Sequence, residues 1–266
     1  MVRAVRSTLH ALPYSSELIV VNDASTDRTL QAISSIGDSR LRVINSQGRG
    51  LVSALNTGIE ASQGEFIARM DADDVCLPWR FSLQLKTMRS SPEIDFLFST
   101  AVAFGSSLSP LFFMPQLPWP LSVDDFKKVL ARRNPAVHPT MISRASSLKA
   151  LGGYRDCPAE DEHLWLTAAL NGQKLARAGL PVIALRLHGA QRTRQKGWQD
   201  ASVRDRTIPA LRRILGENLG PSEGTDSLPF KLFDFLDSNG FSSFRIFASL
   251  VKSRVLRRVK GGSNRS

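Results

Sequence analysis

The chain has 266 residues, of which 42% are hydrophobic and 22% charged, so collagen-like, coiled-coil and wholly disordered classes are excluded. Its length fits one α/β domain with an appendage. Lys and Arg outnumber Asp and Glu by 35 to 24, and the net charge of +11 favours partners that carry phosphate or an anionic membrane surface. Two cysteines and an opening segment without the apolar core of a signal peptide favour a reducing, cytoplasmic location.

Short apolar runs alternate with helical patterns along the first hundred residues. The runs predict buried strands at 17–21, 41–44, 65–70 and 94–104. The segments between them carry apolar residues at helical spacing. This alternation predicts an α/β fold with a doubly wound, mostly parallel central sheet and helices on both of its faces.

The second half of the chain begins with a long uncharged stretch between Asp95 and Asp124. Four prolines interrupt this stretch, so it is too short for a membrane span and predicts a buried strand followed by an irregular loop. The next predicted elements are a polar segment at 134–144, a helix at 160–170, a strand at 182–187 and a helix at 203–215 that is kinked or interrupted at Pro209. We expect a folded domain at 1–219, a linker at 220–228 and a basic extension at 229–266.

The basic extension has two interpretations. Seven basic residues and no acidic ones lie between 241 and 266. One helical face there is apolar, with Phe244, Phe247, Val251, Val255 and Val259. The segment is therefore either a peripheral contact with the cytoplasmic face of a membrane or a helix docked on the folded domain.

Carboxylates follow two of the predicted strands. Open parallel sheets bind ligands beyond the carboxyl ends of their strands. Asp23 ends the first strand, where it is either a ligand contact or a turn former. Asp71, Asp73 and Asp74 follow the third strand and are either an ordinary acidic turn or ligands for a hard cation that holds a diphosphate.

A third acidic cluster opens the helix at 160–170. Its charges complement the helix dipole, and Asp161 is also a candidate general base beside a metal-bound diphosphate.

Two histidines have separate interpretations. His138 is interpreted as a packed or surface residue, whereas His188 ends a strand, where a neutral imidazole can complete a metal site.

Several segments together resemble family 2 glycosyltransferases over residues Met1 to Arg194. They read ELIVVNDASTDRT, ALNTGIEASQGEFIARMDADD, NPAVHPTMISR, GGYRD, AEDEHLWL and LRLHGAQ. The resemblance implies a GT-A fold, a nucleotide-diphosphate sugar donor, and displacement of the diphosphate by an acceptor hydroxyl with inversion at the sugar carbon. The domain at 1–219 then becomes the catalytic domain.

The resemblance also implies a role for each matching residue. Asp23 is similar to the acid that contacts the base, and Arg49 to a weaker nucleotide or phosphate contact. Asp71 resembles the first acid of the DxD motif, which reaches the ribose or the metal waters, and Asp73 resembles the ligand of Mn²⁺ or Mg²⁺. Asp161 resembles the catalytic base. His188 is similar to a histidine that closes the metal site in some members.

Two features depart from the family pattern. Asn22 stands where the family most often has another Asp. The chain also begins inside the helix that follows the family's first strand, so a central strand with a Pro-x-Tyr-Asn-like turn is missing. We expect the natural reading frame to extend upstream of Met1 and to encode that strand.

The sequence therefore predicts a metal-dependent inverting glycosyltransferase of cell-envelope polysaccharide biosynthesis, with a glycan or lipid-linked glycan as acceptor. One alternative is a catalytically inactive relative that only binds, favoured by the missing strand. A sugar nucleotidyltransferase is less favoured, because its glycine-rich, lysine-bearing loop is absent. Nucleic acid is not expected as a partner, since the basic tail has no interleaved aromatic residues.

Overall fold

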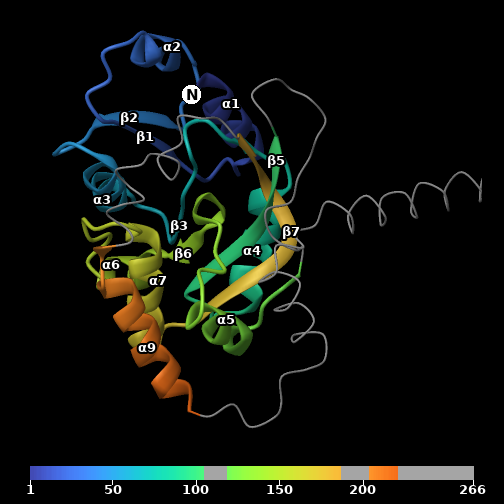
Figure 1. Cartoon of the computed structure of the whole chain (residues 1–266). Helices are drawn as coiled ribbons and strands as arrows, with labels where there is room; N and C mark the ends of the chain where they lie inside the picture. The colour runs from blue at the N-terminus through green and yellow to red at the C-terminus, as the bar shows by residue number, and fades with distance from the viewer. Residues whose placement is uncertain (105–118, 187–203, 221–266) are drawn as a thin grey trace, which may run out of the picture.

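The first two strands form a small parallel sheet (Figure 1). The computed structural model describes residues 1–104, 119–186 and 204–220. Strand β1 (Leu18–Asn22) pairs with β2 (Leu41–Asn45). Helices α1 (Val2–Ala11) and α2 (Thr29–Ser34) belong to the same unit. Their apolar faces meet the sheet in one cluster, made by Val5, Leu9, Val20 and Ile33.

A second sheet of five strands, in the order β3-β6-β5-β7-β4, forms the body of the protein. Its strands are β3 (Phe66–Ala68), β4 (Val75–Cys76), β5 (Phe96–Phe104), β6 (Ile142–Arg144) and β7 (Leu175–Arg186). Among these described strands, only β5 and β7 pair in parallel, and the other three pairings are antiparallel.

The α/β class is confirmed, but the expected single, mostly parallel sheet differs from the structure. The larger sheet is mixed because β6, a short strand within the polar segment 134–144, inserts antiparallel between β3 and β5. Strand β4 adds a further antiparallel pairing at the far edge, against β7. Both strands are too short to show an alternating pattern in the sequence.

The remaining helices surround the two sheets, with α3 packed against β1 and α9 against α7 (Figure 1). They are α3 (Leu51–Ala61), α4 (Arg80–Ser90), α5 (Val123–Leu130), α6 (Ala145–Ala150), α7 (Glu160–Leu170), α9 (Thr207–Leu219) and the 3₁₀ turn η1 (His138–Thr140). The main core joins β5 to α5 and α7. Its centre is Phe98, whose ring lies 4.7 Å from that of Trp165 and 5.2 Å from that of Phe126. Full burial of each such side chain stabilises the fold by roughly 2–3 kcal/mol.

Helix α9 closes the described part of the chain. It begins at Thr207, so Pro209 lies in its first turn, where no backbone donor is required, and the expected interruption is wrong. Arg212 of α9 forms an ion pair with the buried Glu162 of α7. Within the described ranges, no helix has both the length and the apolar character needed to cross a bilayer. Most of the expected linker and all of the extension at 229–266 lie outside the described residues.

Candidate active site

The first part of the site lies at the end of β1. Asp23 follows this strand, and its two carboxylate oxygens accept hydrogen bonds from the backbone nitrogen of Gly50, at 3.1 and 2.9 Å. Gly50 has a φ of +94° at the start of α3, which allows the loop to turn back toward β1. The exposed Arg49 is thereby held next to Asp23. The two predicted nucleotide contacts thus share one rim.

Asn22, the departure from the family pattern, has a structural role. Its side-chain nitrogen donates to Asn45 Oδ1 at 3.0 Å, across the β1–β2 pair. Its Oδ1 accepts from the backbone nitrogen of Ser25 at 3.0 Å and so shapes the turn that carries Asp23. An amide supplies both the donor and the acceptor that these contacts need.

One hydrogen bond joins the segments that precede β1 and β3. Glu17, just before β1, accepts it from the backbone nitrogen of Gln63, before β3, at 3.0 Å. The two strands then face one cavity of about 540 Å³, which residues 18–21 and 65–71 help to line. That Asp23 and Asp71 share one rim stays a prediction.

Three carboxylates gather after β3. Oxygen atoms of Asp71, Asp73 and Asp74 all lie within 4.8 Å of one another. Arg69 forms a bidentate ion pair with Asp71, in which Nη1 donates to Oδ2 at 3.0 Å. Burial raises the pKa of Asp71, and the charge of Arg69 opposes that rise.

Asp74 is the most buried member of this cluster. Its Oδ1 accepts from the backbone nitrogen of Arg186, at 2.9 Å, whereas Oδ2 has no hydrogen-bond partner among the described residues. Burial, assisted by the charges of Asp71 and Asp73, raises the pKa of Asp74 to about 7. A buried carboxylate oxygen without a partner, beside two further carboxylates, fits a hard divalent cation such as Mn²⁺ or Mg²⁺.

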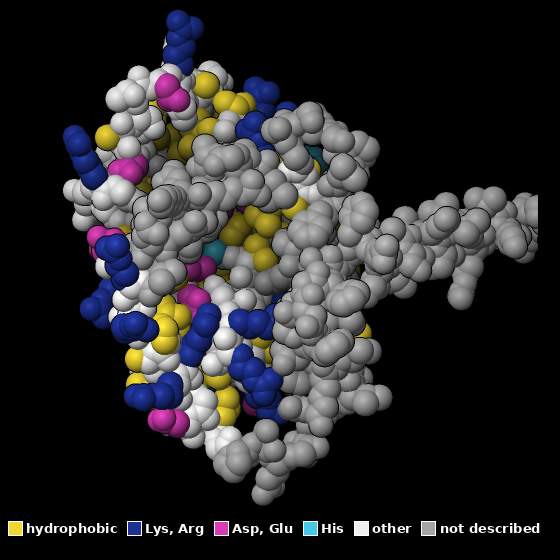
Figure 2. All heavy atoms as spheres, in the orientation of Figure 1, with side chains coloured by type: hydrophobic (Ala, Val, Ile, Leu, Met, Phe, Trp, Pro, Cys, Tyr) yellow, Lys and Arg dark blue, Asp and Glu magenta, His cyan; other side chains and the backbone are white. Residues whose placement is uncertain are grey.

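Asp161 lies in the first turn of α7, on the same side as the acidic cluster. Ala159 precedes that turn with a left-handed φ of +57°, and Asn134 donates its side-chain nitrogen to Asp161 Oδ2 at 3.3 Å. Burial raises the pKa of Asp161, and the positive charge of Arg69 lowers it. Arg69 therefore acts electrostatically on both Asp71 and Asp161. In the space-filling view, acidic side chains lie beside a hollow near the middle of the face (Figure 2).

A group of packed aromatic rings lies near Asp161, whose charge acts on the Tyr154 hydroxyl. His138 Nε2 lies 2.7 Å from the Tyr154 hydroxyl, and the rings of both residues contact Trp165. Burial lowers the pKa of His138 well below its ordinary value, so the imidazole is neutral. The interpretation of His138 as a packed residue is confirmed.

Arg69, Asn134 and Tyr154 take part in the site although the sequence did not single them out. Arg69 directly follows β3, and its role depends on the charge that it places beside Asp71 and Asp161. His188, the predicted closing histidine, lies outside the described residues. Thus Asp23, Arg49, Asp71, Asp73 and Asp161 are the predicted site residues that the structure places.

Comparison with known proteins identifies the N-terminal part of the chain. Residues 1–114 match the family model described as "Glycosyl transferase family 2". This part belongs to glycosyl transferase family 2. Among individual relatives is the amylovoran biosynthesis glycosyltransferase AmsE of Erwinia amylovora. It is 27% identical over 188 residues, which make up 69% of this chain and 69% of that protein.

Two solved structures have a similar fold. The S. aureus protein TarS, in complex with UDP-GlcNAc, has a TM-score of 0.62 at 18% identity and aligns with 83% of this chain. This chain spans 63% of that structure. The mannosyltransferase PcManGT of Pyrobaculum calidifontis, in complex with GDP-Man and Mn²⁺, has a TM-score of 0.52 at 19% identity, covering 95% of this chain and 74% of that one. The predicted GT-A fold is confirmed.

Proposed function

We propose that the protein is an inverting glycosyltransferase that moves a sugar from a nucleotide-diphosphate sugar to a hydroxyl group of a glycan or lipid-linked glycan. The observation that carries the proposal is the cluster of Asp71, Asp73 and Asp74, with the partly buried Asp161 near it, since the charge of Arg69 acts on both Asp71 and Asp161. The names of TarS and PcManGT, with their nucleotide-sugar ligands, support the donor class. The name of AmsE supports a role in polysaccharide biosynthesis.

The donor is proposed to lie along the rim formed by β1 and β3. Asp23 accepts hydrogen bonds from the base, and Arg49 pairs with the nucleotide or its phosphates. Both are held in place by the bond between Asp23 and Gly50. Asp71 faces the ribose or the ligands of the cation. Arg69 fixes the orientation of the Asp71 carboxylate through the bidentate ion pair.

The acidic cluster is proposed to hold Mn²⁺ or Mg²⁺, with Asp73 and the free oxygen of Asp74 as ligands and His188 as a further one. When bound, such a cation supplies positive charge to the departing diphosphate. The three carboxylates supply the oxygen ligands that a hard divalent cation prefers, and Arg69 and Arg80 offset part of their charge.

Asp161 is proposed to act as the general base. Its carboxylate takes the proton of the acceptor hydroxyl as that oxygen forms a bond to the sugar carbon. The bond from the sugar carbon to the diphosphate breaks, and its electron pair leaves with the diphosphate. A single displacement inverts the configuration at that carbon. The raised pKa of Asp161 supports this role, because burial strengthens the base.

The test is a panel of nucleotide-diphosphate sugars with glycan and lipid-linked glycan acceptors, in Mn²⁺, Mg²⁺ or EDTA. We expect release of nucleoside diphosphate with one donor, dependent on acceptor and metal, and NMR of the product should show an inverted anomeric centre. A retained configuration would contradict the inverting mechanism. Tight donor binding without turnover would favour the alternative of an inactive binding protein.

The basic extension is proposed to bring the protein to an anionic membrane surface, where lipid-linked acceptors lie. The support is its sequence alone: seven basic residues, no acidic ones and an apolar helical face within 241–266. Deleting 241–266 should release the protein from anionic vesicles and leave turnover with a water-soluble acceptor unchanged. Loss of folding on deletion would instead support a docked helix.

A further inference from the structure

Arg80 is a buried cation at the first position of α4. Its side chain is 0% exposed. A positive charge at the N-terminus of a helix is unfavourable, because the helix dipole is positive at that end. Taking a guanidinium group out of water is also costly unless negative charge nearby compensates it. The position of Arg80 therefore requires a compensating partner.

The hydrogen bonds that fix the guanidinium group go to neutral acceptors. Nη2 donates to Arg69 O at 2.7 Å and to Met141 O at 3.3 Å. Nη1 lies 3.3 Å from Met70 Sδ, and Nε donates to Gln84 Oε1 at 3.1 Å. These four acceptors hold the group in place, but none of them supplies a negative charge.

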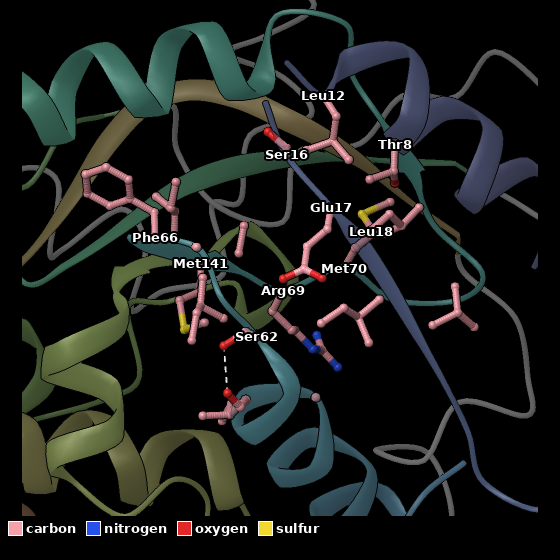
Figure 3. Close-up of a pocket in the computed structure, with 18 of the residues that line it drawn as sticks. Thr8, Leu12, Ser16, Glu17, Leu18, Ser62, Phe66, Arg69, Met70 and Met141 are labelled. Carbon is pink, nitrogen blue, oxygen red and sulfur yellow. Dashed lines mark hydrogen bonds between the residues drawn. The ribbon is translucent and has the colours of Figure 1, made fainter. Parts of the chain in front are cut away.

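The same contacts place the guanidinium group against the segment that leads into the acidic cluster. Arg69 and Met70 are the two residues before Asp71. Figure 3 shows both, with Met141, among the residues that line the cavity between β1 and β3. The compensating charge is therefore the cluster itself, and the electrostatics agree. Burial raises the pKa of Asp71 and the charge of Arg80 opposes that rise.

Gln84 prevents the Arg80 side chain from turning away from the cluster. While its Oε1 accepts from Arg80, its Nε2 donates to Thr140 O at 2.7 Å and to Ser99 Oγ at 3.2 Å. Gln84, Thr140 and Ser99 are all buried. A buried network with its partners in place is rigid, so the positive charge stays at one point of the fold.

We propose that Arg80 is a positioning residue that balances the charge of the acidic cluster and weakens the affinity of the cluster for a divalent cation. Three carboxylates within 4.8 Å of one another repel, and a cation built into the fold reduces that repulsion permanently. The same positive charge repels Mn²⁺ or Mg²⁺ and so favours exchange of the ion between turnovers. The effect on the ion rests on the proposed function, whereas the charge balance does not.

The charge balance is tested by a double-mutant cycle of urea unfolding in EDTA, without a sugar donor. Arg80→Met removes the positive charge, and Asp74→Asn removes one carboxylate but keeps an oxygen that can accept from Arg186 N. We expect the decrease in urea midpoint caused by Arg80→Met to be about twofold smaller in the Asp74→Asn background. Equal decreases in the two backgrounds would overturn the proposal.

Arg177→Met is the matched control. Arg177 is 2% exposed and also donates to backbone carbonyls, those of Trp119 at 3.3 Å and Pro135 at 3.0 Å. It lies on β7, and its pKa is lowered by burial and by Arg133. The decrease in urea midpoint caused by Arg177→Met should therefore be the same with Asp74 and with Asn at that position.

Arg80→Lys keeps the charge but loses the planar fork of donors. It should recover most of the urea midpoint that Arg80→Met loses, and this comparison also decides the case in which Arg80→Met does not fold. A lysine variant as unstable as the methionine variant, or unfolded like it, would show that Arg80 acts only through its hydrogen bonds and would overturn the proposal.

Titration with Mn²⁺ alone, followed by EPR of the free ion, tests the effect on affinity. Arg80→Met should bind Mn²⁺ about threefold or more tightly than wild type, and Arg80→Lys should match wild type. Unchanged or weaker binding by Arg80→Met would overturn the effect on affinity. If no form bound Mn²⁺, the metal role in the proposed function would fail together with that effect, whereas the cycle in EDTA would still decide the charge balance.

Discussion

Two adjacent glycines give a sharp test of how the turn before α7 is held. Gly152 and Gly153 have φ values of +77° and +78°. A Cβ at Gly152 meets nothing within 4 Å, whereas a Cβ at Gly153 would lie 2.4 Å from Asn56 Oδ1. The side chain of Asn56 is not free to move away. Its nitrogen donates to Tyr154 O and its oxygen accepts from Tyr154 N, both at 2.8 Å.

These contacts set the expected magnitudes. Gly152→Ala only places a side chain on a left-handed backbone, which costs about 1 kcal/mol of unfolding free energy. Gly153→Ala has the same backbone cost and also displaces Asn56. Losing two hydrogen bonds of about 1 kcal/mol each brings its total to about 3 kcal/mol.

Urea unfolding followed by tryptophan fluorescence measures both variants, and an Asn56→Ala background completes the cycle. In that background the obstructing amide and its bonds are already gone, so Gly153→Ala should cost no more than Gly152→Ala. Equal costs of the two glycine substitutions in the wild-type chain would refute the reasoning. An excess that survives in Asn56→Ala would refute it as well.

Three further predictions concern the site. Asp161→Asn should lower turnover by about 10²–10⁴-fold and leave donor affinity unchanged. The control Asp124→Asn replaces an exposed acid in the first turn of α5 and should leave both turnover and donor affinity unchanged. Near-normal turnover in Asp161→Asn would remove this residue from the mechanism. Asp73→Ala should abolish the Mn²⁺-dependent part of donor affinity in calorimetry, and an unchanged metal effect would exclude this residue as a ligand. The lowered pKa of the packed His138 means that the folded protein binds fewer protons than the unfolded chain. The free energy of unfolding should therefore decrease as pH falls below about 6.5. Measuring the free energy of unfolding of wild type and His138→Gln at pH 7.5 and 5.5 separates the contribution of His138 from that of Asp74. An identical pH dependence of the two proteins would contradict the contribution of His138.

The sequence predicted the elements whose signals are local. The helix at 160–170 coincides with α7, and the strands at 17–21, 41–44 and 65–70 each overlap an observed strand, because apolar runs bounded by polar turns depend only on neighbouring residues. The same signals place Asp23 directly after β1 and Asp71 shortly after β3, as the sequence predicts.

The sequence did not reveal features that depend on distant partners. Strand β6 has 3 residues, and only its pairing with β3 and β5 makes it a strand. The sequence therefore did not predict the direction of each strand pairing or the division of the strands into two sheets. Arg69 was overlooked for the same reason, since its importance comes from the charge it places beside both Asp71 and Asp161.

The pairing of β5 with β7 has a consequence for synthesis on the ribosome. Strand β5 ends at Phe104 and β7 begins at Leu175, so 175 − 104 = 71 positions separate them. At about 5–20 residues per second, the ribosome needs roughly 4–14 s to supply the partner. During that interval β6 covers only Phe96 and Leu97, and the rest of the apolar strand FLFSTAVAF has no parallel neighbour. Such an exposed edge pairs readily with other chains, so the nascent protein needs a chaperone most while residues 105 to 186 are being made.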